Sequence, residues 1–126
     1  VSPRLFIPNK TTTLFASLQP RDFSDGQRIR EQADLLRSGR PPSTELLDNA
    51  FTRPLYQHLP ELAELPVVMR STGAPNVALS GAGPTHYTVV DDDVQANHIA
   101  RELRARLRTR ADVFVAKPLQ TRYHGR

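Results

Sequence analysis

Residues 76–90 constrain the fold of this chain more than any other stretch. Two short apolar runs, 77–79 and 86–90, flank the loop sequence Ser-Gly-Ala-Gly-Pro-Thr at 80–85. Both runs contain β-branched residues, and the glycine-rich loop between them leaves no room for a helix. The stretch therefore predicts a strand, a tight loop and a second strand, paired as a β-hairpin.

The loop has the composition of an anion-binding turn. Gly81 and Gly83 can adopt positive φ without a Cβ penalty, and so can turn backbone N–H groups toward one point. Ala82 adds little bulk, and the hydroxyls of Ser80 and Thr85 can hydrogen-bond a phosphate oxygen. The same residues also suit a plain hairpin turn, because Gly-x-Gly is a weak motif by itself. Local physics leaves both interpretations open.

The segment before residue 43 is predicted to hold a strand and two helices. Residues 4–7 have the pattern of a strand ended by Pro8, and residues 9–13 can cap a short helix at 14–18. The second helix is amphipathic and is ended by the glycine and prolines of 38–42. Its apolar stripe consists of Ile29, Ala33 and Leu36.

Prolines divide the segment 43–73. A helix that starts near residue 43 cannot run unbroken through Pro54, so it must break near residue 52 or restart with Pro54 in a first turn. Pro60 opens a further helix, which Pro66 should kink and Gly73 should end.

The segment after the hairpin predicts a helix and a last strand. The three aspartates at 91–93 supply an N-cap and a favourable negative charge at the helix start. Arginines at 101, 104 and 108 face water, and residues 113–116 form the strand. The buried stripe of the helix is predicted to be Ile99, Ala100, Leu103 and Leu107.

This order of elements predicts one α+β domain. A strand, several helices, a hairpin, a helix and a strand are best accommodated by an antiparallel sheet with helices packed on one face. A ferredoxin-like sandwich with extra helices fits, and we expect the domain to span 1–122, with 123–126 as a C-terminal tail. The start at Val1 and the single methionine, Met69, suggest a piece of a longer protein.

Composition excludes several classes of function. The chain has no cysteine, and its four histidines lack the spacing of a metal site, so we expect no metal ligands. No apolar run is long enough to span a membrane, and the first twenty residues lack the basic start and apolar core of a signal peptide. We therefore expect a cytoplasmic protein that does not bind membranes. The net charge of +4 arises largely at 101–110 and at the C-terminus.

Motifs in a fixed order resemble those of the GHMP small-molecule kinases. The loop 80–85, between two strands and before an acidic-capped helix, is similar to the third conserved motif of that family. Within the family, the chain is most similar to the C-terminal domain of the kinases that phosphorylate an erythritol derivative in non-mevalonate isoprenoid synthesis. Further motifs that agree are Leu-Phe-Ile-Pro at 5–8, Leu-Gln-Pro-Arg-Asp-Phe-Ser-Asp-Gly at 18–26, Asn49, Leu-Pro-Glu-Leu at 59–62, Gly-Ala at 73–74 and Phe-Val-Ala-Lys at 114–117.

The resemblance implies phosphoryl transfer from ATP, with Mg²⁺, to the 2-hydroxyl of a small-molecule substrate. It also implies that an N-terminal kinase domain of the same polypeptide, absent from this chain, holds the main phosphate loop and the catalytic residues. No catalytic residue is therefore expected here. The positions expected to support the diphosphate of ATP are Ser80, Gly81, Ala82, Gly83 and Thr85.

Two positions depart from the family pattern. The family commonly has Ser where Ala82 stands, which removes a hydroxyl but keeps the backbone arrangement. It commonly has Asn-Asp where this chain has Asn49-Ala50. We expect Asn49 to have a capping or packing role, because Asn satisfies free backbone groups at helix ends.

Alternative functions remain at this point. The substrate of a GHMP kinase can instead be homoserine, mevalonate or a sugar. A ferredoxin-like sheet with an arginine-rich helix can also bind RNA, although such sheets stack bases on exposed strand aromatics and the hairpin offers only Tyr87. The RNA-binding module is therefore the less favoured alternative, and nucleic acid is not an expected partner.

Overall fold

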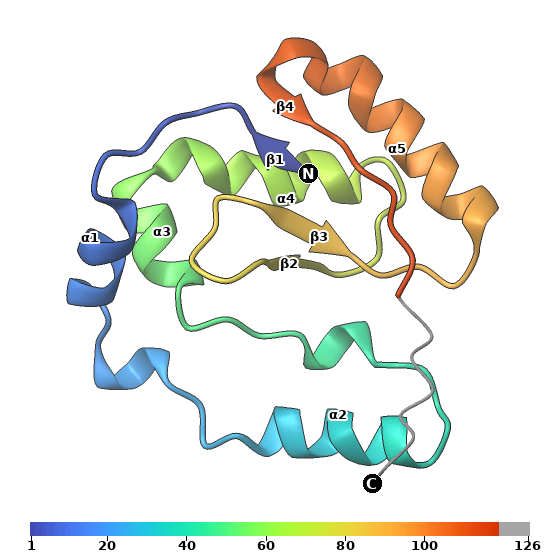
Figure 1. The fold of residues 1–126 in the computed structure, drawn as a ribbon, viewed down its shortest axis with the longest axis horizontal. Coiled ribbons are helices and arrows are strands. Elements are labelled where there is room, and N and C mark those ends of the chain that lie inside the picture. The colour runs from blue at the N-terminus through green and yellow to red at the C-terminus, as the bar shows by residue number, and fades with distance from the viewer. Residues whose placement is uncertain (119–126) are drawn as a thin grey trace, which may run out of the picture.

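A computed structural model of the chain describes residues 1–118 (Figure 1). Helices cover the ends and one side of a small group of strands, and short 3-10 helices (η) connect several of them. The elements in chain order are β1 (Ser2–Pro3), α1 (Lys10–Ala16), η1 (Pro20–Asp22), α2 (Gln27–Arg37), η2 (Thr44–Leu46), α3 (Thr52–His58), η3 (Pro60–Ala63), α4 (Glu64–Arg70), β2 (Val77–Leu79), β3 (His86–Thr88), α5 (Asp93–Leu107), η4 (Arg108–Arg110) and β4 (Ala111–Asp112).

The strands form two antiparallel pairs, which backbone hydrogen bonds join. β1 pairs with β4, and β2 pairs with β3 in the register that places Leu79 opposite His86. The N–H of His86 donates to the carbonyl of Val1 (2.9 Å), and the Val1 amine donates to the carbonyl of His86 (2.8 Å). This exchange places the start of β1 beside β3, so the spatial order is β4-β1-β3-β2. The ferredoxin-like α+β fold expected from the sequence is confirmed.

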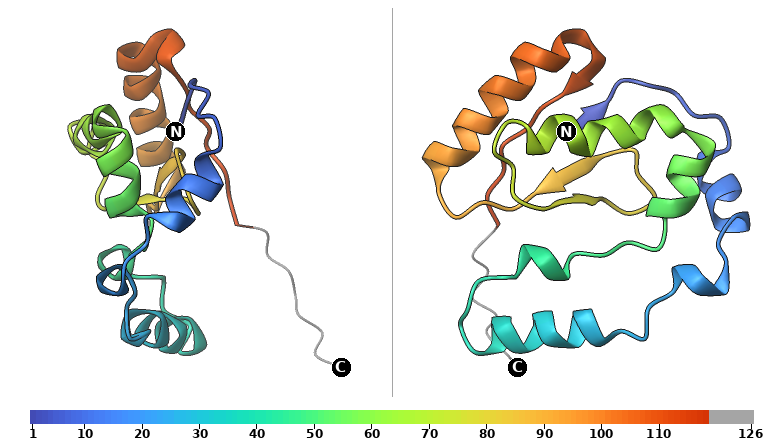
Figure 2. Two further views of the ribbon diagram at one scale, coloured as in Figure 1. Left: turned by 90° about the vertical axis from the view of Figure 1, so that its left-hand side faces the viewer. Right: turned by 180° about the vertical axis from the view of Figure 1, so that it is seen from behind.

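The main core lies between the strands and the two helices on one side of them. In the first view of Figure 2, α4 and α5 both lie on the same side of β2 and β3. Met69 of α4 and Leu103 of α5 are each only 1% exposed, which places them at the centre of this core. The buried members of this cluster are Leu65, Met69, Ala74, Ile99, Leu103, Leu107 and Ala111.

A second core fixes α1 and α3 against the end of the hairpin. Leu14 of α1, Leu55 of α3, Leu62 of η3 and Leu79 of β2 form one buried cluster. Because Leu79 directly precedes the glycine loop, this cluster anchors one side of the loop to helices from far earlier in the chain.

Helix α2 lies apart from both cores, at the edge of the molecule (Figure 1). None of its residues is buried, and Ile29 is 74% exposed. The side chain of Gln32 ties the helix to the segment before η2 by donating to the carbonyl of Ser43 (2.9 Å) and accepting from its N–H (2.8 Å). None of the helices within residues 1–118 is long and apolar enough to cross a membrane.

Most helix predictions are confirmed. The helix with the Ile29 stripe is α2, and α5 has Asp92 at its N-cap, with the aspartate carboxylate accepting from the N–H of Gln95 (2.7 Å). Helix α3 begins at Thr52 with Pro54 in its first turn, which is the second of the two predicted alternatives. Its start is also the predicted break point. The helix predicted to start near residue 43 was wrong, because only the short 3-10 helix η2 forms there.

Pro66 acts differently from the predicted kink. The chain runs as the 3-10 helix η3 from Pro60 and becomes the α-helix α4 at Glu64. Pro66 is then the third residue of α4, where its missing N–H lies in the first turn and breaks no hydrogen bond.

The positions of both outer strands were predicted wrongly. β1 is Ser2–Pro3 rather than 4–7, and β4 is Ala111–Asp112 rather than 113–116. Most of the apolar residues that suggested strands are exposed, with Phe6 at 89% and Phe114 at 73%, although Ile7 and Val113 are half-buried. Strand propensity reflects packing on a half-buried surface, which the exposed side chains do not have. The first helix also starts earlier than predicted, at Lys10, and Asn9 at its N-cap makes no side-chain cap bond. The predicted tail at 123–126 lies outside the described residues.

Candidate anion-binding loop

The loop 80–85 is a closed turn between β2 and β3. The N–H of Ser80 donates to the carbonyl of Thr85 (2.8 Å), and the N–H of Gly83 donates to the carbonyl of Ser80 (2.9 Å). Gly81 has φ 54° and Gly83 has φ 70°, as the sequence predicted. The five predicted cofactor-binding positions therefore lie together, but the N–H of Gly83 is already used within the loop.

Side-chain donors from three other segments hold carbonyls of the loop and of the strand residue that precedes it. The side-chain amide of Asn49 donates to the carbonyls of Leu79 (2.8 Å) and Gly81 (2.9 Å). The Lys10 ammonium at the start of α1 donates to the carbonyl of Gly83. The Nδ1–H of His86 donates to the carbonyl of Pro84 (2.9 Å).

Unlike these carbonyls, the N–H groups of Gly81 and Ala82 have no hydrogen-bond partner within residues 1–118. Neither group donates to a backbone or side-chain acceptor there. Ser80 and Gly81 are exposed, while Ala82 is half-buried. Adjacent backbone N–H groups in a turn of this kind form a concavity that binds anions.

The two glycines of the loop are needed for different reasons. A Cβ on Gly83 would lie 2.8 Å from Leu55 Cδ2 and 2.8 Å from Leu79 Cδ1, whereas nothing lies within 4 Å of a Cβ on Gly81. Gly83 therefore brings the backbone close to the second core. Gly81 serves the turn through its positive φ alone.

A pair formed by the buried His86 and the half-buried Tyr56 supports the exit of the loop. The hydroxyl of Tyr56 lies 2.6 Å from Nε2 of His86, and the two rings stack with centroids 5.9 Å apart. Because the Pro84 carbonyl can only accept, Nδ1 of His86 carries a proton and Nε2 accepts from Tyr56. Burial lowers the pKa of His86, so the neutral ring is favoured. This pair was not predicted from the sequence; the alternation of inward His86 and outward Tyr87 on β3 is the signal that indicates it.

An ion pair links the η1 segment to α3. The Arg53 guanidinium bonds both carboxylate oxygens of Asp22 and donates to the carbonyl of Ser17 (2.9 Å). The N–H of Gln19 donates to the same carboxylate (2.7 Å). These bonds, led by the one from Arg53, lower the pKa of Asp22 to about 2. The motif at 18–26 thus has a clear structural role, which is to hold the chain between α1 and α2.

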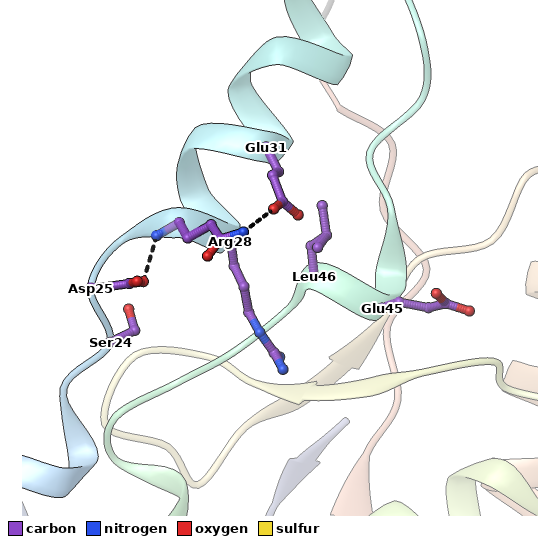
Figure 3. A pocket seen from close by; sticks show the side chains of 7 residues that line it. Ser24, Asp25, Arg28, Glu31, Glu45 and Leu46 are labelled. Atoms are coloured by element: carbon purple, nitrogen blue, oxygen red, sulfur yellow. Dashed lines mark hydrogen bonds between the residues drawn. The ribbon is translucent and has the colours of Figure 1, made fainter.

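Two hollows lie along α2, away from the loop. The smaller, of about 380 Å³, is polar and lies between the start of α2 and η2 (Figure 3). The larger, of about 530 Å³, is mainly apolar and extends toward Asn49 and Ala50. None of the loop residues 80–85 lines either hollow. Within residues 1–118, no group of three or more His, Asp or Glu side chains could hold a metal ion.

Comparison with known proteins agrees with the resemblance seen in the sequence. A family model described as "GHMP kinases C terminal" matches residues 25–109. The 4-diphosphocytidyl-2-C-methyl-D-erythritol kinase of Dehalococcoides mccartyi strain BAV1 is 31% identical over 102 residues, which is 80% of this chain and 36% of that protein. The kinase of the same name from strain 195 is 28% identical over 96 residues, 76% of this chain and 34% of that protein.

A solved structure extends the agreement to three dimensions. The crystal structure of a 4-(cytidine 5'-diphospho)-2C-methyl-D-erythritol kinase matches with a TM-score of 0.66 and 27% sequence identity, over 82% of this chain and 37% of that one. The chain thus spans about a third of the length of the relatives that it matches. Since the family model covers most of the chain, the chain belongs to the GHMP kinase C-terminal family.

Proposed function

We propose that this chain is the C-terminal domain of an ATP-dependent kinase that phosphorylates the 2-hydroxyl of 4-diphosphocytidyl-2-C-methyl-D-erythritol. Family membership and the names of the similar proteins support the kinase class and the substrate. The proposed domain spans residues 1–122. The proposed pathway is non-mevalonate isoprenoid synthesis, and the proposed location is the cytoplasm, where ATP is available.

The hydrogen bonding of the loop 80–85 is the observation that carries a nucleotide role. Protein donors occupy the carbonyls on one side of the loop, while the N–H groups of Gly81 and Ala82 have no acceptor among the described residues. Unpaired backbone donors on an exposed turn favour a negatively charged partner. A phosphate oxygen of ATP has the charge and the acceptor capacity that these groups require.

The loop residues would then orient the diphosphate and balance its charge. Ser80 and Thr85 flank the N–H groups of Gly81 and Ala82. The Ser80 hydroxyl can add a donor, whereas the Thr85 hydroxyl donates to the hydroxyl of Ser2 on β1 (3.2 Å) and would have to rotate to reach a phosphate. None of these groups acts as base or nucleophile, since phosphoryl transfer depends mainly on positioning and on electrostatic stabilisation. We propose that an N-terminal domain of the full-length protein holds most of the ATP and the Mg²⁺, which neutralises charge on the transferred phosphoryl group.

Assays of the full-length protein that contains this chain test the proposal. The protein is incubated with Mg²⁺·ATP and with each of four alcohols: the cytidylylated methylerythritol, homoserine, mevalonate and a sugar. We expect ADP and a phosphorylated product, identified by ³¹P NMR, with the methylerythritol derivative alone. Turnover of another alcohol would contradict the proposed substrate but support the proposed kinase activity. Failure to phosphorylate any of the four would contradict the proposal.

The RNA-binding alternative has less support in the structure. Tyr87 is 37% exposed on β3 and is the one aromatic residue of the hairpin strands. Two arginines of α5 are engaged by the protein, since Arg104 donates to the carbonyl of Val113 and Arg106 to the hydroxyl of Ser71. A salt-dependent gel shift with single-stranded RNA would revive this alternative.

A further inference from the structure

We infer that Asn49 is a positioning residue, which fixes the direction of the N–H group that Ala82 presents to the anion. This role rests on the proposed function of the loop. Three hydrogen bonds define the side chain: its Nδ2 donates to the carbonyls of Leu79 (2.8 Å) and Gly81 (2.9 Å), and its Oδ1 accepts from the N–H of Phe51 (2.8 Å). The expected capping role is therefore only part of what Asn49 does.

The orientation of this amide is determined by its partners. The backbone N–H of Phe51 can only donate, so Oδ1 must face it, and the NH₂ group must then face the two carbonyls. Phe51 directly precedes α3, whose Leu55 is fully buried against Leu79. The amide is thus held on a rigid support rather than on a mobile loop.

The hydrogen bond from Asn49 to the Gly81 carbonyl also affects the N–H group of Ala82, which belongs to the same peptide unit. The carbonyl of Gly81 and the N–H of Ala82 belong to the same planar trans peptide, so they point in opposite directions. When Asn49 holds the carbonyl, the N–H is fixed on the other side. The preceding peptide is held in the same way, because the N–H of Gly83 holds the carbonyl of Ser80 opposite the N–H of Gly81.

This arrangement separates Asn49 from the ligand. Asn49 lies on the carbonyl side, and any phosphate would lie on the N–H side, so Asn49 acts through the backbone and does not touch the substrate. The consequence is specific: losing the amide should free the peptide between Gly81 and Ala82 while the two hydrophobic cores stay intact.

The substitution Asn49→Asp tests the inference in the full-length protein. Asp has nearly the same shape and keeps the acceptor for Phe51, but it puts a carboxylate oxygen against two carbonyl oxygens. We expect the KM for ATP to rise about tenfold, as for loss of one or two hydrogen bonds, with the KM for the second substrate within about twofold. Asn49→Ala, which removes the bonds without adding repulsion, should show the same split if Asn49→Asp folds poorly.

Asn97→Asp is the matched control. The amide of Asn97 also donates to a backbone carbonyl, that of Asp93 (2.7 Å), but on the exposed face of α5. The substitution Asn97→Asp should leave the KM values for ATP and for the second substrate unchanged. An unchanged KM for ATP in both Asn49 variants would overturn the inference.

A second measurement separates this inference from the proposed function. Backbone NMR of the same proteins without nucleotide reports the loop directly, whether or not the parent is a kinase. We expect Asn49→Asp to shift the amide resonance of Ala82 and to leave those of α5 in place. If the resonance of Ala82 does not move, the inference is wrong even when the kinase is active; if it moves in a protein that phosphorylates nothing, only the proposed function fails.

Discussion

Gly83 packs so closely against Leu55 that a Cβ on the glycine would lie 2.8 Å from Leu55 Cδ2. Leu55 has no exposed surface, and its neighbour Leu79 is 4% exposed. The loop that we propose to bind phosphate is therefore supported directly by the second hydrophobic core. Gly83 therefore has a packing role, whereas nothing lies within 4 Å of a Cβ on Gly81.

We predict that Gly83→Ala destabilises the domain more than Gly81→Ala. Overpacking a buried site costs about 1 to 3 kcal/mol, and Gly83→Ala adds this to the strain of a positive φ. Gly81→Ala has the strain alone, about 1 to 2 kcal/mol. Urea denaturation of both variants measures the difference. Equal midpoints would show that the two leucines move aside without cost.

For kcat/KM with ATP, we predict that substitution of Gly81 has a large effect although it leaves the hydrophobic core undisturbed. Gly81→Val places a branched side chain at φ 54° in open space, so it should disturb the turn without disturbing the core. In the full-length protein we expect kcat/KM for ATP to fall by about a hundred- to a thousandfold, as when one well-placed donor is lost. Ala82→Ser keeps the backbone arrangement and should leave the rate unchanged or raise it. A normal rate for Gly81→Val would assign the loop a purely structural role.

The stripe of α5 gives a prediction about stability. Leu103 is 1% exposed in the main core, so Leu103→Ala should lower the free energy of unfolding by about 2 to 5 kcal/mol. Arg104 is exposed, and its hydrogen bond to the Val113 carbonyl is exposed to water as well, so Arg104→Ala should stay within about half a kcal/mol. Similar losses in the two variants would mean that the helix is turned the other way.

His86 should make the stability of the domain depend on pH. Burial lowers its pKa in the folded protein, while the unfolded chain has the ordinary value near 6.5. Below about pH 6.5 the unfolded state therefore binds a proton that the folded state does not, and the free energy of unfolding should fall between about pH 7 and 5. Urea denaturation across this range should show a weaker dependence in His86→Gln. The exposed His98→Gln is the control and should behave like the parent; a parent with flat stability would contradict the burial of a neutral His86.

Local signals explain which parts of the fold could be predicted from the sequence. The hairpin, the cap at Asp92 and the stripe of α5 each depend on residues within a few positions of one another. The outer strands could not be placed, because β1 and β4 pair across more than a hundred residues and exposed aromatics such as Phe6 and Phe114 resemble strand residues.

The same limit applies to the site. The composition of the loop indicated its two positive φ angles. The contacts that hold it could not be found, since Asn49 and Lys10 reach the loop from 32 and 73 positions away along the chain. Gly83 was predicted only as a residue that supports the diphosphate. Its packing role could not be predicted, because its contact with Leu55 joins residues far apart in the sequence.

The claim that the N–H groups of Gly81 and Ala82 receive an ATP phosphate is tested most directly by NMR. The full-length protein, labelled with ¹⁵N, is titrated with Mg²⁺ and a non-hydrolysable ATP analogue. We predict that the amide resonances of Gly81 and Ala82 move and become protected from solvent exchange, while that of Gly73, another glycine with positive φ (92°), stays in place. Saturation of the protein with the analogue while the amides of Gly81 and Ala82 neither move nor gain protection would contradict the account.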